Sequence, residues 1–169
     1  MSERIVLDGS QLTRAQVVAI ARHGAMVGLD PMQLQRVAHA ADFLVEKMRG
    51  GEPIYGVTTG FGSNADKLLG SHRVREELPG RNPEARADTL PEELQHNLIV
   101  THAVCVGEPL AAEVVRAMLA IRINTLMRGH SGIRVQTLQA LAALLDAGVI
   151  PVVPDKGSVG ASGDLAPLS

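Results

Sequence analysis

Aromatic residues, cysteine and long apolar runs are scarce in this sequence of 169 residues. Aromatic side chains make up 2% of the residues, whereas hydrophobic residues make up 46%. A core with so few aromatic rings must be aliphatic, which favours packed helices over a β-sandwich. The single cysteine, Cys105, excludes an internal disulfide, and no spacing of cysteine and histidine predicts a metal site.

An excess of charge of one sign is also lacking, because the net charge is only −2. This balance gives no basis for binding nucleic acid or a membrane surface, so we expect neither partner. No stretch is apolar over the ~20 residues that a membrane-spanning helix requires. The N-terminal residues also lack the apolar run of a signal peptide. We therefore expect a cytoplasmic protein.

Local patterns predict a mainly α fold, a helical bundle with a short N-terminal strand and glycine-rich loops. The strand covers Arg4 to Leu7 and ends at a turn. Apolar spacing and caps predict helices over Arg14–His23, Pro31–Arg49, Glu92–Val106, Leu110–Arg128 and Gly132–Asp146. Residues 70–93 form a polar connection, and residues 149–157 are extended because two prolines forbid a helix there. The last two helices are apolar on more than one side, which indicates a larger bundle or an oligomer.

The stretch GSVGASGD, from Gly157 to Asp164, is rich in small residues. Its glycines do not fit the dinucleotide pattern G-x-G-x-x-G, and the G-K-[ST] of a P-loop is missing. A serine hydrolase that used Ser162 would need glycine two residues later, where the sequence has Asp164. A tight turn that leads into a helix, capped by Ser162 or Asp164, explains the same residues.

The triplet Ala161-Ser162-Gly163 offers another explanation, because it can cyclise on itself. The Gly163 nitrogen attacks the Ala161 carbonyl and two waters leave, which converts Ser162 into a dehydroalanine within a five-membered ring. Glycine permits the sharp fold of the backbone, alanine leaves the carbonyl accessible, and serine provides the hydroxyl that is lost. The product is an electrophilic methylidene that no ordinary side chain supplies.

Two further positions stand out by residue type. Tyr55 is the only tyrosine of the sequence and lies in the glycine-rich stretch YGVTTGFG; an aromatic residue at an interface is the alternative. His102 follows Thr101 on a predicted helix, and the spacing places both on one face with Leu98 and Cys105. A buried histidine that is bonded to a neighbour would explain His102 equally well.

Four stretches, in order, resemble the histidine and aromatic amino acid ammonia-lyase family: YGVTTGFG, LQHNLIVTHAVCVGEPL, RINTLMRGHSGIR and PVVPDKGSVGASGDLAPLS. They cover most of residues 54–169. The resemblance implies that residues 1–169 form the N-terminal segment of a larger unit with the ammonia-lyase (fumarase/aspartase-like) fold. Its tyrosine loop would cover residues 54–64. The prosthetic group implied is 4-methylidene-imidazole-5-one (MIO), formed by residues 161–163 within the loop 157–164, without a metal or nucleotide.

The same resemblance implies roles for individual residues. Tyr55 matches the base that removes the β-proton of the substrate, and Gly62 matches a glycine that lines the substrate. Thr101 and His102 match the pair that selects the substrate, in a pattern similar to that of histidine lyases. The implied reaction is the deamination of L-histidine to trans-urocanate; a tyrosine or phenylalanine lyase and an aminomutase on the same scaffold are the alternatives.

Three residues have supporting roles in this interpretation. Asp164 would assist ring closure, Asn97 would support the site, and His130 in RGHSGIR is interpreted as a capping or packing residue. The resemblance also implies a homotetramer, or else a complementary C-terminal chain, as the partner. A non-catalytic fragment or partner module is the remaining alternative.

Overall fold

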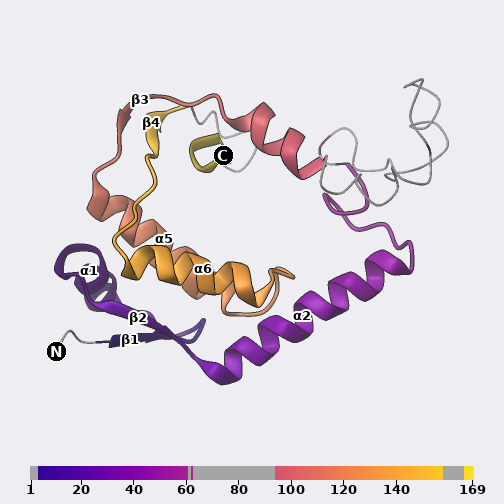
Figure 1. The fold of residues 1–169 in the computed structure, drawn as a ribbon, viewed down its shortest axis with the longest axis horizontal. Helices are drawn as coiled ribbons and strands as arrows, with labels where there is room; N and C mark the ends of the chain where they lie inside the picture. The colour runs from indigo at the N-terminus through magenta and orange to yellow at the C-terminus, as the bar shows by residue number, and fades with distance from the viewer. Residues whose placement is uncertain (1–3, 61, 63–93, 158–165) are drawn as a thin grey trace. The chain divides into compact units, whose positions relative to one another are not determined.

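The computed structural model describes residues 4–60, 62, 94–157 and 166–169. The chain divides into two units, Met1–Leu44 with Val106–Lys156, and Val45–Cys105 with Gly157–Ser169. Helices predominate among the described residues (Figure 1), which confirms the predicted mainly α class. The predicted polar connection over 70–93 lies outside the described residues.

The N-terminal residues form a small parallel β–α–β arrangement in the first unit. Strands β1 (Arg4–Leu7) and β2 (Met26–Leu29) pair in parallel, and helix α1 (Arg14–His23) connects them. Alternate side chains of β1, Ile5 and Leu7, are buried, as expected for a strand with one face on a core. The predicted strand and helix are confirmed, whereas the sequence patterns did not predict β2.

Side-chain caps explain where the first two helices begin. Thr13 forms a capping box with Gln16: its Oγ1 accepts the Gln16 N–H at 3.3 Å, and its own N–H donates to Gln16 Oε1 at 2.9 Å. Helix α2 (Pro31–Arg49) has proline at its first position, and the carboxylate of Asp30 accepts the N–H of Gln33 at 2.9 Å. Both predicted starts are confirmed.

Helices α5 (Ala112–Leu126) and α6 (Val135–Asp146) complete the core of the first unit. Both are shorter than predicted. Helix α5 packs against α1 and α6, and α6 packs against β2 (Figure 1). The largest fully buried side chains are all aliphatic or methionine: Leu7, Ile20, Val27, Val37, Ile123, Met127, Leu138 and Leu145. This composition agrees with the scarcity of aromatic residues in the sequence.

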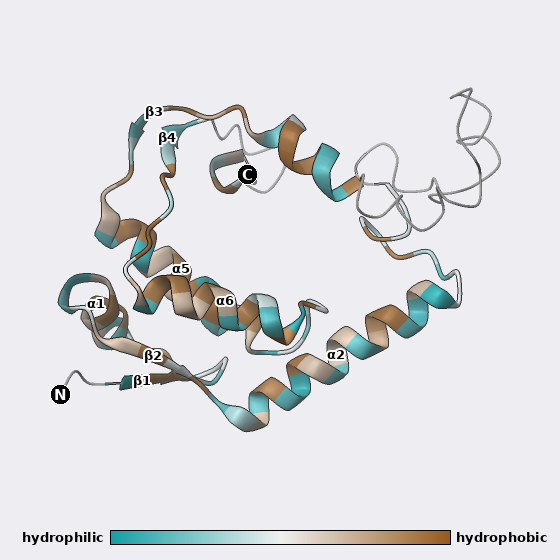
Figure 2. Cartoon of the chain, viewed as in Figure 1, coloured by the Kyte–Doolittle hydropathy of each residue, from teal (hydrophilic) through white to brown (hydrophobic). Residues whose placement is uncertain are grey.

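A second apolar stripe of α5 lies on the surface. Val114 and Ile121 share one helix face by their spacing and are 42% and 50% exposed. The buried face consists of Val115, Ala120 and Ile123. Figure 2 shows hydrophobic residues along α5 and α6. Within the described residues, the second apolar stripe of α5 therefore stays exposed, whereas its sequence predicted a helix that is covered on several sides.

Arg116 on α5 connects the ends of two other helices. Its Nε and Nη2 donate to the carbonyl oxygen of Ile20 at 3.1 and 2.9 Å, and its Nη1 donates to that of Leu145 at 3.0 Å. Ile20 lies in the last turn of α1 and Leu145 in the last turn of α6. The carbonyl groups of a last turn have no N–H donor within their own helix, so Arg116 supplies one. A cation also suits the negative end of the helix dipole.

Residues 103–109 are not helical, which corrects the predicted helix over Glu92–Val106. Helical residues end at 102, and strand β3 (Val106–Pro109) pairs antiparallel with strand β4 (Pro154–Lys156). Gly107, the residue after the predicted helix, is a strand residue with a φ of 101°. A Cβ at Gly107 would lie 3.3 Å from the side chain of Lys156. Pairing with a distant strand therefore outweighs the local helical pattern.

The remaining described element is a short 3₁₀ helix, η2 (Ala166–Leu168). Of the helices in the described ranges, none is long and apolar enough to cross a membrane.

Candidate active site

The segment after α2 is a tight turn centred on the carbonyl oxygen of Ile54. The N–H groups of residues 57–59 all donate to this oxygen at 3.0 to 3.1 Å. The hydroxyl of Thr58 accepts the N–H of Ile54 at 2.7 Å and donates to the carbonyl of Glu52 at 2.6 Å. The threonines of YGVTTGFG therefore hold the loop that carries Tyr55.

An ion pair also holds the start of this loop. Lys47 Nζ in the last turn of α2 lies 2.7 Å from Glu52 Oε1. The hydrogen bond with Glu52 raises the pKa of Lys47, with a smaller contribution from the negative charge of Glu52. The pair lies at the surface, so salt will screen it.

Tyr55 projects from the turn and is 67% exposed. Its phenol oxygen accepts the N–H of Gly62 at 3.1 Å. Gly62 has a φ of 60°, in the left-handed region that favours glycine. The structure thus brings together two predicted site residues. The N–H can donate to this oxygen in the phenol and in the phenolate, so it orients the oxygen in both states.

Residues 94–102 are helical and carry three other predicted site residues. The hydroxyl of Thr101 donates to the carbonyl oxygen of Asn97 at 2.6 Å, a local hydrogen bond that threonine often makes within helices. His102 is half-buried, whereas Thr101 and Asn97 are exposed. Asn97, the predicted supporting residue, therefore contacts Thr101, one of the two predicted substrate-selecting residues, through its backbone carbonyl.

The hydrogen bond of His102 defines the tautomer of its ring. Nδ1 lies 2.8 Å from the carbonyl oxygen of Leu98. A carbonyl oxygen only accepts, so the proton of this bond belongs to Nδ1. In the neutral ring, Nε2 then carries the lone pair and acts as a hydrogen-bond acceptor.

Cys105 connects this helical segment with the segment that contains the triplet. It lies beyond the helix, so the prediction that it shares a helix face with His102 is wrong. A Cβ on Gly157 would lie 2.9 Å from the Cα of Cys105 and would collide with its Sγ. Gly157, which precedes the triplet segment, therefore contacts Cys105, and Cys105 lies three positions after His102 in the sequence. No local pattern predicts this contact, because Cys105 and Gly157 lie far apart along the chain.

The four remaining predicted site residues, Ala161, Ser162, Gly163 and Asp164, lie outside the described residues. Their sequence holds the atoms that the MIO ring requires: an amide nitrogen, a carbonyl and a hydroxyl. The nearest described elements on either side are β4 and η2. In the described part of the chain, no group of three His, Cys, Asp or Glu side chains could hold a metal ion.

Comparisons with known proteins agree with the motifs. The family model of aromatic amino acid lyases matches residues 12–169. The chain is 50% identical to the histidine ammonia-lyase of Symbiobacterium thermophilum over 161 residues, which is 95% of this chain and 28% of that protein.

Solved structures give the same result. The histidine ammonia-lyase of Trypanosoma cruzi matches with a TM-score of 0.75 at 36% identity. The tyrosine aminomutase of Streptomyces globisporus matches with a TM-score of 0.79 at 32% identity. Each match covers 98% of this chain and 28% of the other chain, so this chain spans less than a third of the length of these relatives. Because the family model covers nearly all of its residues, the chain belongs to the aromatic amino acid lyase family.

Proposed function

We propose that this chain supplies the proton-transfer and substrate-selecting segment of an enzyme that converts L-histidine to trans-urocanate and ammonia. The observation that carries the proposal is the pair Thr101 and His102, whose side chains are held by the backbone carbonyls of Asn97 and Leu98, in a chain that is 50% identical to a histidine ammonia-lyase. Membership of the aromatic amino acid lyase family supports the reaction class.

Ala161, Ser162 and Gly163 would form the MIO group, which the family membership also supports. When present, MIO supplies an electrophile that makes the amine of the substrate a leaving group. Asp164 follows the triplet directly and would assist its ring closure. These roles rest on the motif, because the four residues lie outside the described part of the chain.

Tyr55 would remove a proton from the β-carbon of the substrate. Tyr55 acts in its phenolate form: the proton moves to the phenolate oxygen and gives the phenol, and the electron pair of the broken C–H bond forms the double bond of urocanate as the C–N bond breaks. The Gly62 N–H holds the phenol oxygen at 3.1 Å, which fixes the position of the base before the proton moves. General-base catalysis of this kind contributes about 10²- to 10⁴-fold to a rate.

His102 would select the substrate through Nε2. Because Nδ1 is engaged with the carbonyl of Leu98, the neutral ring offers Nε2 as an acceptor for the N–H of the substrate's imidazole. A phenyl ring has no such donor, so phenylalanine could not form this hydrogen bond. The Asn97 carbonyl supports this arrangement by fixing the hydroxyl of Thr101.

The first test uses a protein of the relatives' full length that contains this chain. Its intact mass should be two waters lighter than its sequence mass. Replacement of Ser162 with alanine should restore the sequence mass and abolish turnover of L-histidine. Full activity of Ser162→Ala would refute the proposal.

A second test addresses selection of the substrate. His102→Leu should lower kcat/KM for L-histidine by about 10- to 100-fold, as expected for one lost hydrogen bond in a binding site. His96→Leu is the matched control, because His96 is an exposed histidine on the same helical segment. Equal effects of the two substitutions would rule out the role of His102.

An aminomutase is the second candidate function, because the structure is similar to a tyrosine aminomutase with a TM-score of 0.79. An aminomutase returns the amine to the β-carbon, whereas a lyase releases it. Product analysis with histidine, tyrosine and phenylalanine separates the two reactions, since only the mutase yields a β-amino acid.

We also propose that the enzyme is a cytoplasmic homotetramer, or that the chain pairs with a complementary C-terminal chain. The exposed apolar residues Val114 and Ile121 on α5 support a partner that covers this stripe. Light scattering of the purified chain, alone and with the remaining part of a relative, would distinguish these assemblies.

A further inference from the structure

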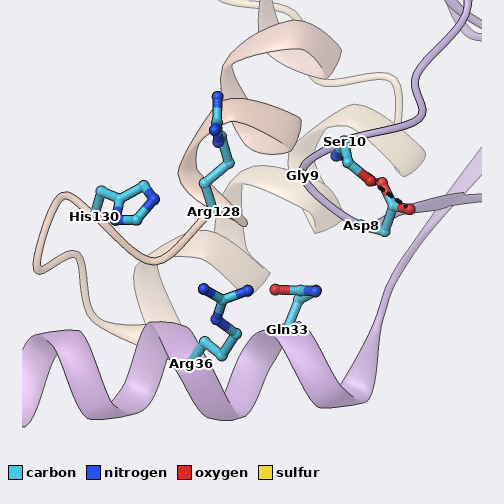
Figure 3. A pocket seen from close by; sticks show the side chains of 7 residues that line it. All are labelled: Asp8, Gly9, Ser10, Gln33, Arg36, Arg128 and His130. Atoms are coloured by element: carbon cyan, nitrogen blue, oxygen red, sulfur yellow. Dashed lines mark hydrogen bonds between the residues drawn. The ribbon is translucent and has the colours of Figure 1, made fainter.

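A cavity of about 370 Å³ lies in the first unit and contains no residue of the proposed reaction (Figure 3). The turn 8–10 after β1 forms one wall, Gln33 and Arg36 on α2 form another, and Arg128 and His130 after α5 form the third. His130 was interpreted as a capping or packing residue, but it is exposed and lines this cavity. Figure 3 shows that the basic side chains come from two different walls.

Close backbone contacts hold the three walls together. Gly9 has a φ of 84°, and a Cβ there would lie 3.0 Å from the backbone nitrogen of Arg128. Gly129 has a φ of 69°, and a Cβ there would lie 3.1 Å from the carbonyl group of Arg36. Larger residues would push the walls apart at both positions. The basic residues are therefore brought together by the fold itself, not by contacts between their side chains.

The acidic residue of the cavity is already bonded within its own turn. Asp8 Oδ1 accepts the N–H groups of Ser10 at 2.8 Å and Gln11 at 2.9 Å, and Oδ2 accepts the Ser10 hydroxyl at 3.0 Å. By contrast, no ion pair involves Arg36 or Arg128 among the residues that the structure describes. The guanidinium group of arginine is a cation with five N–H donors. The cavity thus offers two cations that form no ion pair with any residue in the described ranges.

We propose that this cavity binds a phosphate group, as free phosphate or as part of a small phosphate ester. One guanidinium group can donate two parallel hydrogen bonds to two oxygens of an anion. A phosphate has enough oxygens for Arg36 and Arg128 to bind different ones. The side chains of Gln33 and His130 add donors. The volume of about 370 Å³ falls in the range of small-ligand sites, roughly 300–1,000 Å³.

The test is calorimetric titration of a protein of the relatives' full length, containing this chain, with inorganic phosphate at constant ionic strength. Arg36→Gln and Arg128→Gln should each weaken phosphate binding by about tenfold or more, the loss expected for a charged hydrogen bond. Arg122→Gln is the matched control, because Arg122 is an exposed arginine of α5 outside the cavity and its loss should leave binding unchanged. Thermal unfolding of each variant verifies that it is folded.

Titration with glycerol phosphate separates the two sources of the ligand. Tighter binding than with phosphate supports an ester, and equal or weaker binding supports the free ion. Absence of phosphate binding would overturn the proposal, as would equal binding by all variants. Binding in a Ser162→Ala background makes the result independent of the proposed reaction, because that variant cannot form MIO.

Discussion

Replacing Gly157 with alanine would add a methyl group where the triplet segment touches Cys105. The new Cβ would lie 2.9 Å from the Cα of Cys105 and 3.0 Å from its Cβ. Carbon atoms attract one another at about 3.5–4.0 Å, so both contacts would be repulsive. One of these atoms belongs to the backbone, so rotation of a side chain cannot relieve the clash. Either the segment 103–105 or the chain that leads to Ser162 must move.

The expected cost has two parts. The φ of Gly157 is 136°, and a residue with a side chain in such a sparsely populated region is strained by about 1–3 kcal/mol. Overpacking against Cys105 adds ~1–3 kcal/mol. We expect a loss of about 2–6 kcal/mol from the free energy of unfolding, or else a displaced loop. Displacement would slow formation of MIO, because Gly163 N must approach the Ala161 carbonyl.

Intact mass and thermal unfolding of a full-length protein that contains this chain report these two outcomes. Gly51→Ala is the control: Gly51 has a φ of 71°, but nothing lies within 4 Å of a Cβ there. Gly51→Ala should therefore introduce backbone strain of about 1–2 kcal/mol but no steric clash of the new methyl group. Cys105→Gly removes two of the three repulsive contacts and should restore part of the loss in Gly157→Ala. The reasoning is refuted if Gly157→Ala is as stable as Gly51→Ala and loses both waters completely.

Three further predictions concern the first unit. Arg116→Ala should lower the free energy of unfolding by about 2–4 kcal/mol, because three charged hydrogen bonds to the ends of α1 and α6 are lost; urea unfolding beside the exposed-site control Arg122→Ala measures this. Thr13→Ala should cost about 0.5–2 kcal/mol in the same assay, since it removes the capping box of α1. The Gln11 and Ser10 N–H groups lower the pKa of Asp8. The Asp8 carboxylate therefore adds to the free energy of unfolding above the ordinary aspartate pKa, and this stabilisation is lost as the pH falls through the lowered pKa. The Tm difference between the parent and Asp8→Asn should therefore shrink in acid; a difference that grows in acid would contradict this assignment.

The first two helices could be predicted because their signals are local. Thr13 and Asp30 cap helices that begin at the next residue, and each cap is formed with a residue three positions away. The strands β2 and β3 could not be predicted in the same way. Each is only four residues long and becomes a strand by pairing with β1 or β4. The apolar pattern before Gly107 fits a helix equally well, so only the distant partner decides between the two structures.

The same distinction applies to the candidate site. Tyr55 and Gly62 lie in one motif, so their hydrogen bond is a property of a short loop. The contact between Cys105 and Gly157 joins distant positions and had no signal in the sequence. The roles of Ser162 and its neighbours stay predictions, because residues 158–165 lie outside the described part of the chain.

The first unit is built from two stretches of chain that are separated by residues 45–105. Joining them closes a loop of ~60 residues, which costs about 4 kcal/mol in chain entropy before any contact forms. A ribosome adds about 5–20 residues per second, so the β1–α1–β2 arrangement waits for seconds until α6 has emerged. During that interval its apolar side chains, such as Ile20 and Val27, lack the cover that α5 and α6 provide. Transiently exposed apolar surface of this kind is prone to aggregation, so the discontinuous first unit carries a risk during synthesis that a continuous one would avoid.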